Sequence, residues 1–136
     1  MEVSLLAISD LLTTPTSKLL EEGIGASFLR HKVIAHNLAN VETPGFKRST
    51  VRFEEELKQA VSNAPRLRMT LTHPMHRGNH RGVSSVQPQV VLDNSTSMRQ
   101  DGNNLDVESE MAAMTANTLY NQAITQQLGS YFDRLR

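Results

Sequence analysis

The segment HNLANVETPGFKR, from His36 to Arg48, joins a helical pattern to a sharp turn. Upstream of it, apolar residues recur at spacings near three and four, which predicts a helix from Ser17 to Asn40. Thr43 precedes Pro44, and a residue before proline is pushed out of the helical region. The pair Pro44-Gly45 fits the two central positions of a type II turn, where glycine supplies a positive φ. The segment is therefore expected to end one helix and to re-aim the chain that follows.

The polar side chains of this segment have expected roles at the turn. Asn40 is expected in the left-handed conformation, which asparagine tolerates at the end of a helix. Asn37 lies one helical turn earlier, and we expect its amide to bridge the helix end and the turn. Phe46 is then an apolar anchor, while Lys47 and Arg48 stay in water or meet acidic groups on a partner.

The predicted first long helix has one apolar stripe, formed by Leu20, Ile24, Phe28, Ile34, Leu38 and Val41. Gly23 and Gly25 weaken its first turns by about 1 kcal/mol each relative to alanine. A short third helix is expected from Val51 to Ser62, because Phe53, Leu57 and Val61 repeat every four residues.

The segment after residue 101 has the clearest helical pattern. DGNN indicates a turn followed by capping side chains, and Glu108 and Glu110 suit the positive end of a helix. A heptad repeat persists for about four heptads, which predicts a coiled-coil-like seam. Its a positions are Val107, Met114, Asn121, Leu128 and Leu135, and its d positions are Glu110, Asn117, Ile124 and Tyr131. The polar members are expected to reduce stability and to fix the register.

The middle of the chain, residues 63–100, has no helical period. LRMTL alternates and QVVL is a short β-branched run, so the two favour one small hairpin. The expected organisation is an N-terminal helical region at 1–62, an irregular middle at 63–100 and a C-terminal helix within 101–136. We predict a mainly α fold of one structural domain, in which the two long terminal helices pair as a coiled-coil-like bundle.

Composition excludes several classes of function. The 136 residues carry 14 basic and 14 acidic side chains, so the chain lacks the basic footprint of nucleic-acid binding. With no cysteine, it has no thiol nucleophile and no zinc ribbon. His73, His76 and His80 have a spacing that could hold zinc, but Pro74 disrupts helical placement and no nearby carboxylate completes the set. We expect no catalytic site, no cofactor and no small-molecule substrate.

The opening segment resembles the N-terminal signature of the bacterial flagellar rod and hook axial proteins, roughly N-[LI]-A-N-x-x-T-P-G-[FY]-[KR]. Every fixed position of that signature is matched, by Asn37, Ala39, Asn40, Thr43, Pro44, Gly45, Phe46 and Lys47. A second stretch, DGNNLDVESEM followed by NTLYNQAITQQLGSYF, resembles the C-terminal region of the proximal-rod B subunits. Sibling C-type rod proteins usually carry a SYQAN-like stretch where this chain has LYNQA.

The resemblance implies a structural subunit of the proximal rod, which assembles with its own copies and with other rod proteins into the periplasmic drive-shaft tube. It also implies contact with ring and export-gate components at the rod base, and type III export without a cleaved signal peptide. The matched segment would act as an assembly joint, and the seam residues Val107, Met114, Asn121, Ile124, Leu128, Tyr131 and Leu135 as the assembly helix.

Two alternatives remain open at this point. One is another axial rod protein of the same family, against which residues 101–123 argue. The other is a small helical adaptor or export chaperone, which would be a stable soluble dimer and would leave the opening segment unexplained.

Overall fold

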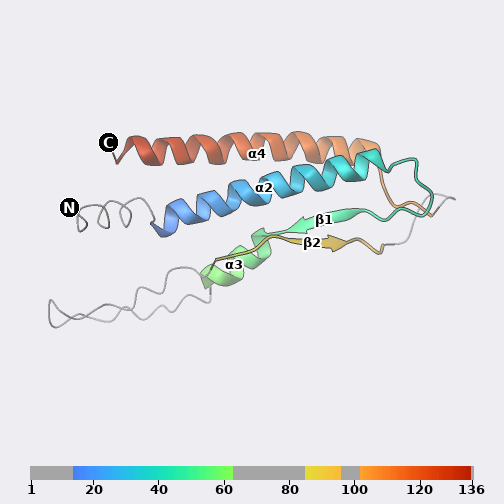
Figure 1. Ribbon diagram of the computed structural model, residues 1–136, viewed down its shortest axis with the longest axis horizontal. Coiled ribbons are helices and arrows are strands. Elements are labelled where there is room, and N and C mark those ends of the chain that lie inside the picture. Colours follow the sequence, from blue (N-terminus) through green and yellow to red (C-terminus); the bar gives the residue numbers. More distant parts are fainter. Residues whose placement is uncertain (1–13, 63–84, 96–101, 136) are drawn as a thin grey trace, which may run out of the picture.

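The structure, a computed structural model, describes residues 14–62, 85–95 and 102–135. Two long helices, α2 (Pro15–Ala39) and α4 (Val107–Asp133), lie side by side and run in opposite directions (Figure 1). Between them in sequence come the strand β1 (Ser49–Arg52), the helix α3 (Glu54–Ser62) and the strand β2 (Gln89–Leu92). The predicted class, mainly α with two long terminal helices that pair, is confirmed. The predicted division at residues 62 and 100 remains a prediction.

Both long helices begin at capping side chains. The Thr14 hydroxyl accepts a hydrogen bond from the amide of Ser17 at 3.3 Å, and Pro15 occupies the first helical position, where its missing N–H costs nothing. Asp106 caps α4 by accepting from the amide of Glu108 at 3.1 Å. The capped start predicted for the C-terminal helix is therefore confirmed.

The sheet differs from the expected hairpin. β1 pairs with β2 in antiparallel register, with Thr50 opposite Val91 and Val51 opposite Val90. Residues 49–52 therefore form a strand, although Val51 was expected to begin the third helix. The cause is pairing of β-branched residues across the strands, which favours the extended backbone. The other expected hairpin strand, LRMTL at residues 67–71, lies outside the described residues.

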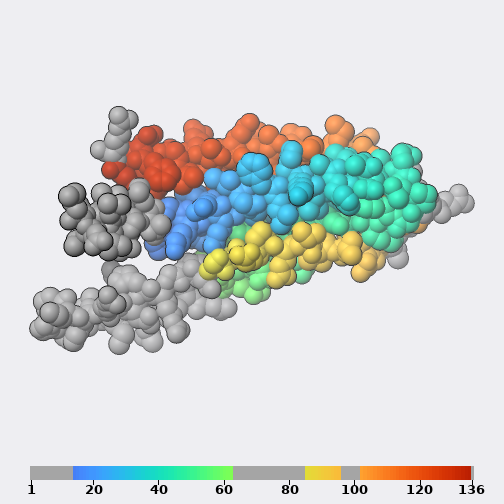
Figure 2. All heavy atoms as spheres, viewed as in Figure 1, coloured from blue at the N-terminus to red at the C-terminus, as the bar shows by residue number. Residues whose placement is uncertain are grey.

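The apolar core of the described residues is small. Phe53, Ala26 and Val86 are buried together, and Leu57 and Ala60 of α3 pack against them. Figure 2 shows α2 between α4 and the layer that contains β2. Because α2 lies between two layers, both neighbours must approach its backbone closely. The buried residues of α2 are accordingly mainly small: Ser17, Gly23, Ala26, Ser27, Ile34 and Asn37.

The prediction is wrong for one residue of the apolar stripe on α2. Phe28 was expected to face the core, but its side chain is 68% exposed. It follows Ala26 and Ser27, which take the two packed positions on that turn, against the small core and against α4. The large ring is thereby turned to solvent.

Candidate functional site: a joint at the end of the helix pair

The turn after α2 has the predicted form. The Thr43 carbonyl accepts a hydrogen bond from the amide of Phe46 at 3.3 Å, which closes a four-residue turn around Pro44 and Gly45. Gly45 has φ of 71°, the positive value that a type II turn requires at this position. A side chain here would be strained even though no other atom lies within 4 Å of the place where its Cβ would be.

Asn40 ends α2 without entering the left-handed region. Its φ is −106° and its ψ is 15°, so the expected left-handed conformation is wrong. Its side-chain amide donates to the His36 carbonyl at 2.8 Å, and its Oδ1 accepts from the Thr43 hydroxyl at 3.3 Å. Asn40 itself bridges the helix end and the turn, the role expected of Asn37.

Asn37 is completely buried and reaches past the turn. Its Nδ2 donates to the Ser49 carbonyl at 2.8 Å, and its Oδ1 accepts from the Ser49 amide at 3.1 Å. Nδ2 also lies 3.1 Å from Oε2 of Glu110. One side chain of α2 therefore holds the first residue of β1 and the first turns of α4.

Glu110 is a buried carboxylate with a cationic neighbour from the same chain. Its side chain is 1% exposed, and its Oε1 forms an ion pair with Nε of Arg48, although neither of these two atoms makes a hydrogen bond. Burial of an unpaired carboxylate is costly, so the guanidinium is needed there. The expectation that Arg48 stays in water or meets a partner's acid is wrong, because it meets an acid of its own chain.

The segment before α4 closes onto the turn. Lys47 Nζ donates to the Gly102 carbonyl at 3.0 Å, across 55 residues of sequence. Asn103 donates to the Val41 carbonyl at 2.8 Å, and Asn104 accepts from the Arg48 amide at 2.9 Å. We call this set the joint; it comprises Asn37, Asn40, Thr43, Pro44, Gly45, Phe46, Lys47, Arg48, Ser49, Gly102, Asn103, Asn104 and Glu110.

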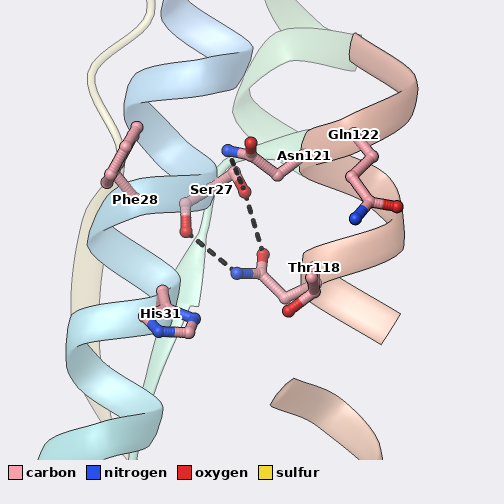
Figure 3. Close-up of a pocket in the computed structure, with 7 residues that line it drawn as sticks. Ser27, Phe28, His31, Thr118, Asn121 and Gln122 are labelled. Carbon is pink, nitrogen blue, oxygen red and sulfur yellow. Dashed lines mark hydrogen bonds between the residues drawn. The ribbon is translucent and has the colours of Figure 1, made fainter. Parts of the chain in front are cut away.

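The seam pairs α4 with α2 along most of its length. Asn117 donates to the Ser27 carbonyl at 3.0 Å, and Asn121 donates to the Ser27 hydroxyl at 3.1 Å (Figure 3). At the other end of the pair, the hydroxyls of Thr14 and Tyr131 lie 2.6 Å apart. These polar contacts all agree with one antiparallel register, which supports the expected function of polar seam groups.

The seam is shorter than the heptad pattern suggested. Its inner members are buried or half-buried: Glu110, Met114, Asn117, Asn121, Ile124, Leu128 and Tyr131. Val107 and Leu135, at its two ends, are each 40% exposed. These two positions lie in the capped first turn of α4 and beyond its last residue, where no part of α2 is shown to cover them.

Comparison with curated proteins gives three informative relatives, all named flagellar basal body rod protein FlgB. The protein from Borreliella burgdorferi is 36% identical over 108 residues, covering 76% of this chain and 80% of the relative. The one from Borrelia hermsii is 38% identical over 112 residues, with the same coverage.

The chain belongs to the FlgB family of flagellar basal body rod proteins. The Bacillus subtilis FlgB is 29% identical over 125 residues, and the match covers 92% of this chain and 93% of the relative. No model of a known protein family matches the chain. The FlgB resemblance inferred from the two motifs is therefore confirmed at the level of the whole chain.

The structure brings the residues of the axial-protein motif together at one end of the helix pair. Asn37, Asn40, Thr43 and Gly45 make or shape the contacts described above, and the Phe46 ring packs on His36 with centroids 5.6 Å apart. Ala39 and Pro44 are exposed. Whether these residues act in assembly stays a prediction.

Sequence reasoning did not assign six of the thirteen joint residues to the joint. They are Arg48, Ser49, Gly102, Asn103, Asn104 and Glu110. The signal that could have found them was Glu110, a carboxylate on an apolar seam. Such a group needs a nearby cation and donors.

Proposed function

We propose that this FlgB-family chain is a structural subunit of the flagellar basal body rod. The observation that carries the proposal is family membership over more than three quarters of the chain, in a fold dominated by two paired helices. In finer detail, we propose that it belongs to the proximal rod, on the periplasmic side, and that it polymerises there with its own copies and with other rod proteins.

The joint supports this role by fixing the direction of one part of the subunit against another. Asn37 holds β1 by both hydrogen-bonding groups of Ser49, and the Arg48–Glu110 ion pair joins the same segment to α4. A polymer repeats one contact geometry in every copy, so each subunit must present its surfaces at the same angle. A rigid joint meets that requirement.

Further partners and the route of delivery also belong to the proposal. We propose contacts with ring and export-gate components at the rod base, and export without a cleaved signal peptide. In the described part of the chain no helix is long and apolar enough to cross a membrane.

Catalysis is not part of the proposed role. In the acidic run at the start of α3, Glu54 and Glu55 are exposed, and Glu54 forms a two-oxygen contact with Arg30 at 2.7 Å. Glu56 alone of the three lines a surface pocket, so these carboxylates do not converge as an acid–base pair. The His73, His76 and His80 set lies outside the described residues.

The test is complementation of a strain that lacks this gene with an epitope-labelled chain. Swimming is scored on soft agar, and purified basal bodies are examined by immuno-electron microscopy. We expect restored swimming and label on the rod. A chain that restores swimming but leaves the rods unlabelled, and that purifies as a stable dimer from the soluble fraction, would instead support the adaptor.

A further inference from the structure

The strand β2 has an open edge in the described part of the chain. It lies on the side of β1 away from α2 (Figure 1). The Asp93 amide donates across the sheet to the Arg48 carbonyl at 2.8 Å. Backbone groups of successive strand residues point in opposite directions, so the groups of Leu92 and Val90 point away from β1. No described residue forms a hydrogen bond with these groups.

The matching edge of β1 is closed by the joint, whereas β2 has no such cover. Ser49 lies opposite Leu92 in the sheet, and the Asn37 side chain binds both of its backbone groups. The Val90 and Leu92 side chains are 51% and 60% exposed, and Figure 2 shows this segment at the molecular surface. Within β2 there is neither a charged residue nor a proline, the usual protection of an edge strand. Such an edge is a template for an added strand.

A pocket beside the start of β2 indicates the charge of the added strand. Glu54 pairs with Arg30 and Glu55 pairs with Arg52, but Glu56 forms no ion pair with any described residue. Glu56 is half-buried, and the pocket beside it has a volume of about 330 Å³. The pocket is lined by Glu56, Gln59, Ala60, Ser85, Val86, Gln87 and Gln89. Amide groups and one carboxylate without a cation favour a basic side chain on whatever lies along this edge.

We propose that an extended segment of a second copy of this chain adds to β2 as a third strand. That segment is residues 67–71, LRMTL, which lies outside the described residues. Its apolar residues alternate with Arg68 and Thr70, so the sequence combines a strand pattern with the cation that the pocket favours. The Val90 and Leu92 side chains are exposed in the single chain, so the added strand comes from another copy. The inference rests on the proposed function, because a rod subunit has copies of itself as neighbours.

The length of β2 predicts how strong this contact is. Val90 and Leu92 each offer one backbone donor and one acceptor to the added strand. A strand as short as β2 gives only marginal stability by itself. Two free chains therefore associate weakly, and the contact becomes effective when other rod contacts hold neighbouring copies in place.

The first test blocks the edge and leaves the pairing of β1 with β2 in place. Leu92→Pro removes an N–H that points away from β1, where an edge strand tolerates proline. Leu92→Ala is the control that keeps this N–H. Each epitope-labelled variant is co-expressed with wild type, and its label is compared between purified basal bodies and whole cells. We expect Leu92→Pro to enter rods about tenfold less than wild type, and Leu92→Ala to enter normally.

A second variant keeps this test decisive if proline lowers the helicity measured by circular dichroism. Val90→Lys keeps both backbone groups and introduces the charge that ordinarily protects an edge. Val61→Lys is its control, because Val61 is an equally exposed valine on α3. We expect Val90→Lys to enter rods less than Val61→Lys does.

The second test identifies the occupant. The chain has no cysteine, so Leu92→Cys and Met69→Cys each provide a single attachment point. The two variants are co-expressed with different labels, and basal bodies are treated with a bismaleimide. We expect a crosslinked pair that carries both labels, and none when Ala35→Cys of α2 replaces Leu92→Cys. Crosslinking of Leu92→Cys only to a different protein would overturn the assignment of a second copy. So would a crosslink within one chain in a dilute Met69→Cys/Leu92→Cys monomer.

These outcomes separate the inference from the proposed function. If the wild-type chain lies in rods and both edge variants enter them as well as their controls do, the inference is wrong and the rod assignment stands. If the wild-type chain is absent from rods, both are wrong.

Discussion

The side-chain amide of Asn37 binds both backbone hydrogen-bonding groups of Ser49, at 2.8 and 3.1 Å. It occupies the place that a neighbouring strand would take beside the first residue of β1. Asn37 is completely buried and also contacts Glu110, so its amide serves three polar groups in the interior of the joint. The contact between Asn37 of α2 and Ser49 of β1 is thus the central contact of the joint.

Asn37→Ala should destabilise the isolated protein. The change removes the side-chain amide that pairs with the Ser49 amide, the Ser49 carbonyl and one Glu110 oxygen. Each buried group left unpaired costs about 1–3 kcal/mol. Urea unfolding followed by circular dichroism measures the loss. Asn40→Ala is the matched control, and we expect it to cost less because its contacts lie at an exposed helix end. Equal effects of the two changes would argue against a special role for Asn37.

Arg48→Ala should also be strongly destabilising, because it leaves Glu110 buried without a cation. Breaking a fully buried pair costs about 3–5 kcal/mol, and we expect about 2–4 kcal/mol here since Arg48 is partly exposed. In a double-mutant cycle with Glu110→Gln, the double variant should lose less stability than the two single losses added together. Simple additivity would show that the two side chains do not interact.

The long helices and the turn could be predicted from the sequence because their causes are local. Caps, the proline-glycine pair and the heptad spacing act within a few residues, and they place α2, α4 and the positive φ of Gly45 correctly. The joint depends on contacts between distant segments. No local pattern distinguishes Ser49 as the partner of Asn37, or shows that Thr50 pairs with Val91 before α3 begins.

The exposure of Phe28 has the same origin. A stripe at helical spacing predicts one buried face, but α2 is packed on two sides, by α4 and by the small core around Phe53. The small residues between the large apolar ones therefore take the buried positions. The sequence alone does not reveal how many neighbours a helix has.

Gly45→Val should cost about 1–3 kcal/mol, through backbone strain alone, because no atom lies near the place of the added Cβ. Helicity should be kept, since Asn40 already ends α2. Gly25→Ala is the control: Gly25 is helical and has equally open surroundings, so we expect a gain of about 0.5–1 kcal/mol. Thermal unfolding of both variants measures these two changes in stability. A Gly45→Val protein as stable as wild type would contradict the strained turn.

Ile124→Asp should weaken the free monomer. Its Cδ1 lies 3.4 Å from the position that a Cβ on Gly23 would occupy, so the change puts a charge between α2 and α4 of one chain. We expect a loss of about 1–3 kcal/mol. Leu119→Asp, on the outer face of α4, should stay within about 0.5 kcal/mol of wild type. If Ile124→Asp left monomer stability unchanged and blocked only rod assembly, the seam would join different copies.

The most direct measurement is a cryo-electron microscopy structure of the intact basal body at side-chain resolution. The account predicts FlgB-family density in the rod in which Asn37 binds Ser49, and Arg48 meets Glu110, within each single chain. Density in which Arg48 reaches the Glu110 of a neighbouring subunit, with the joint open inside each chain, would contradict it.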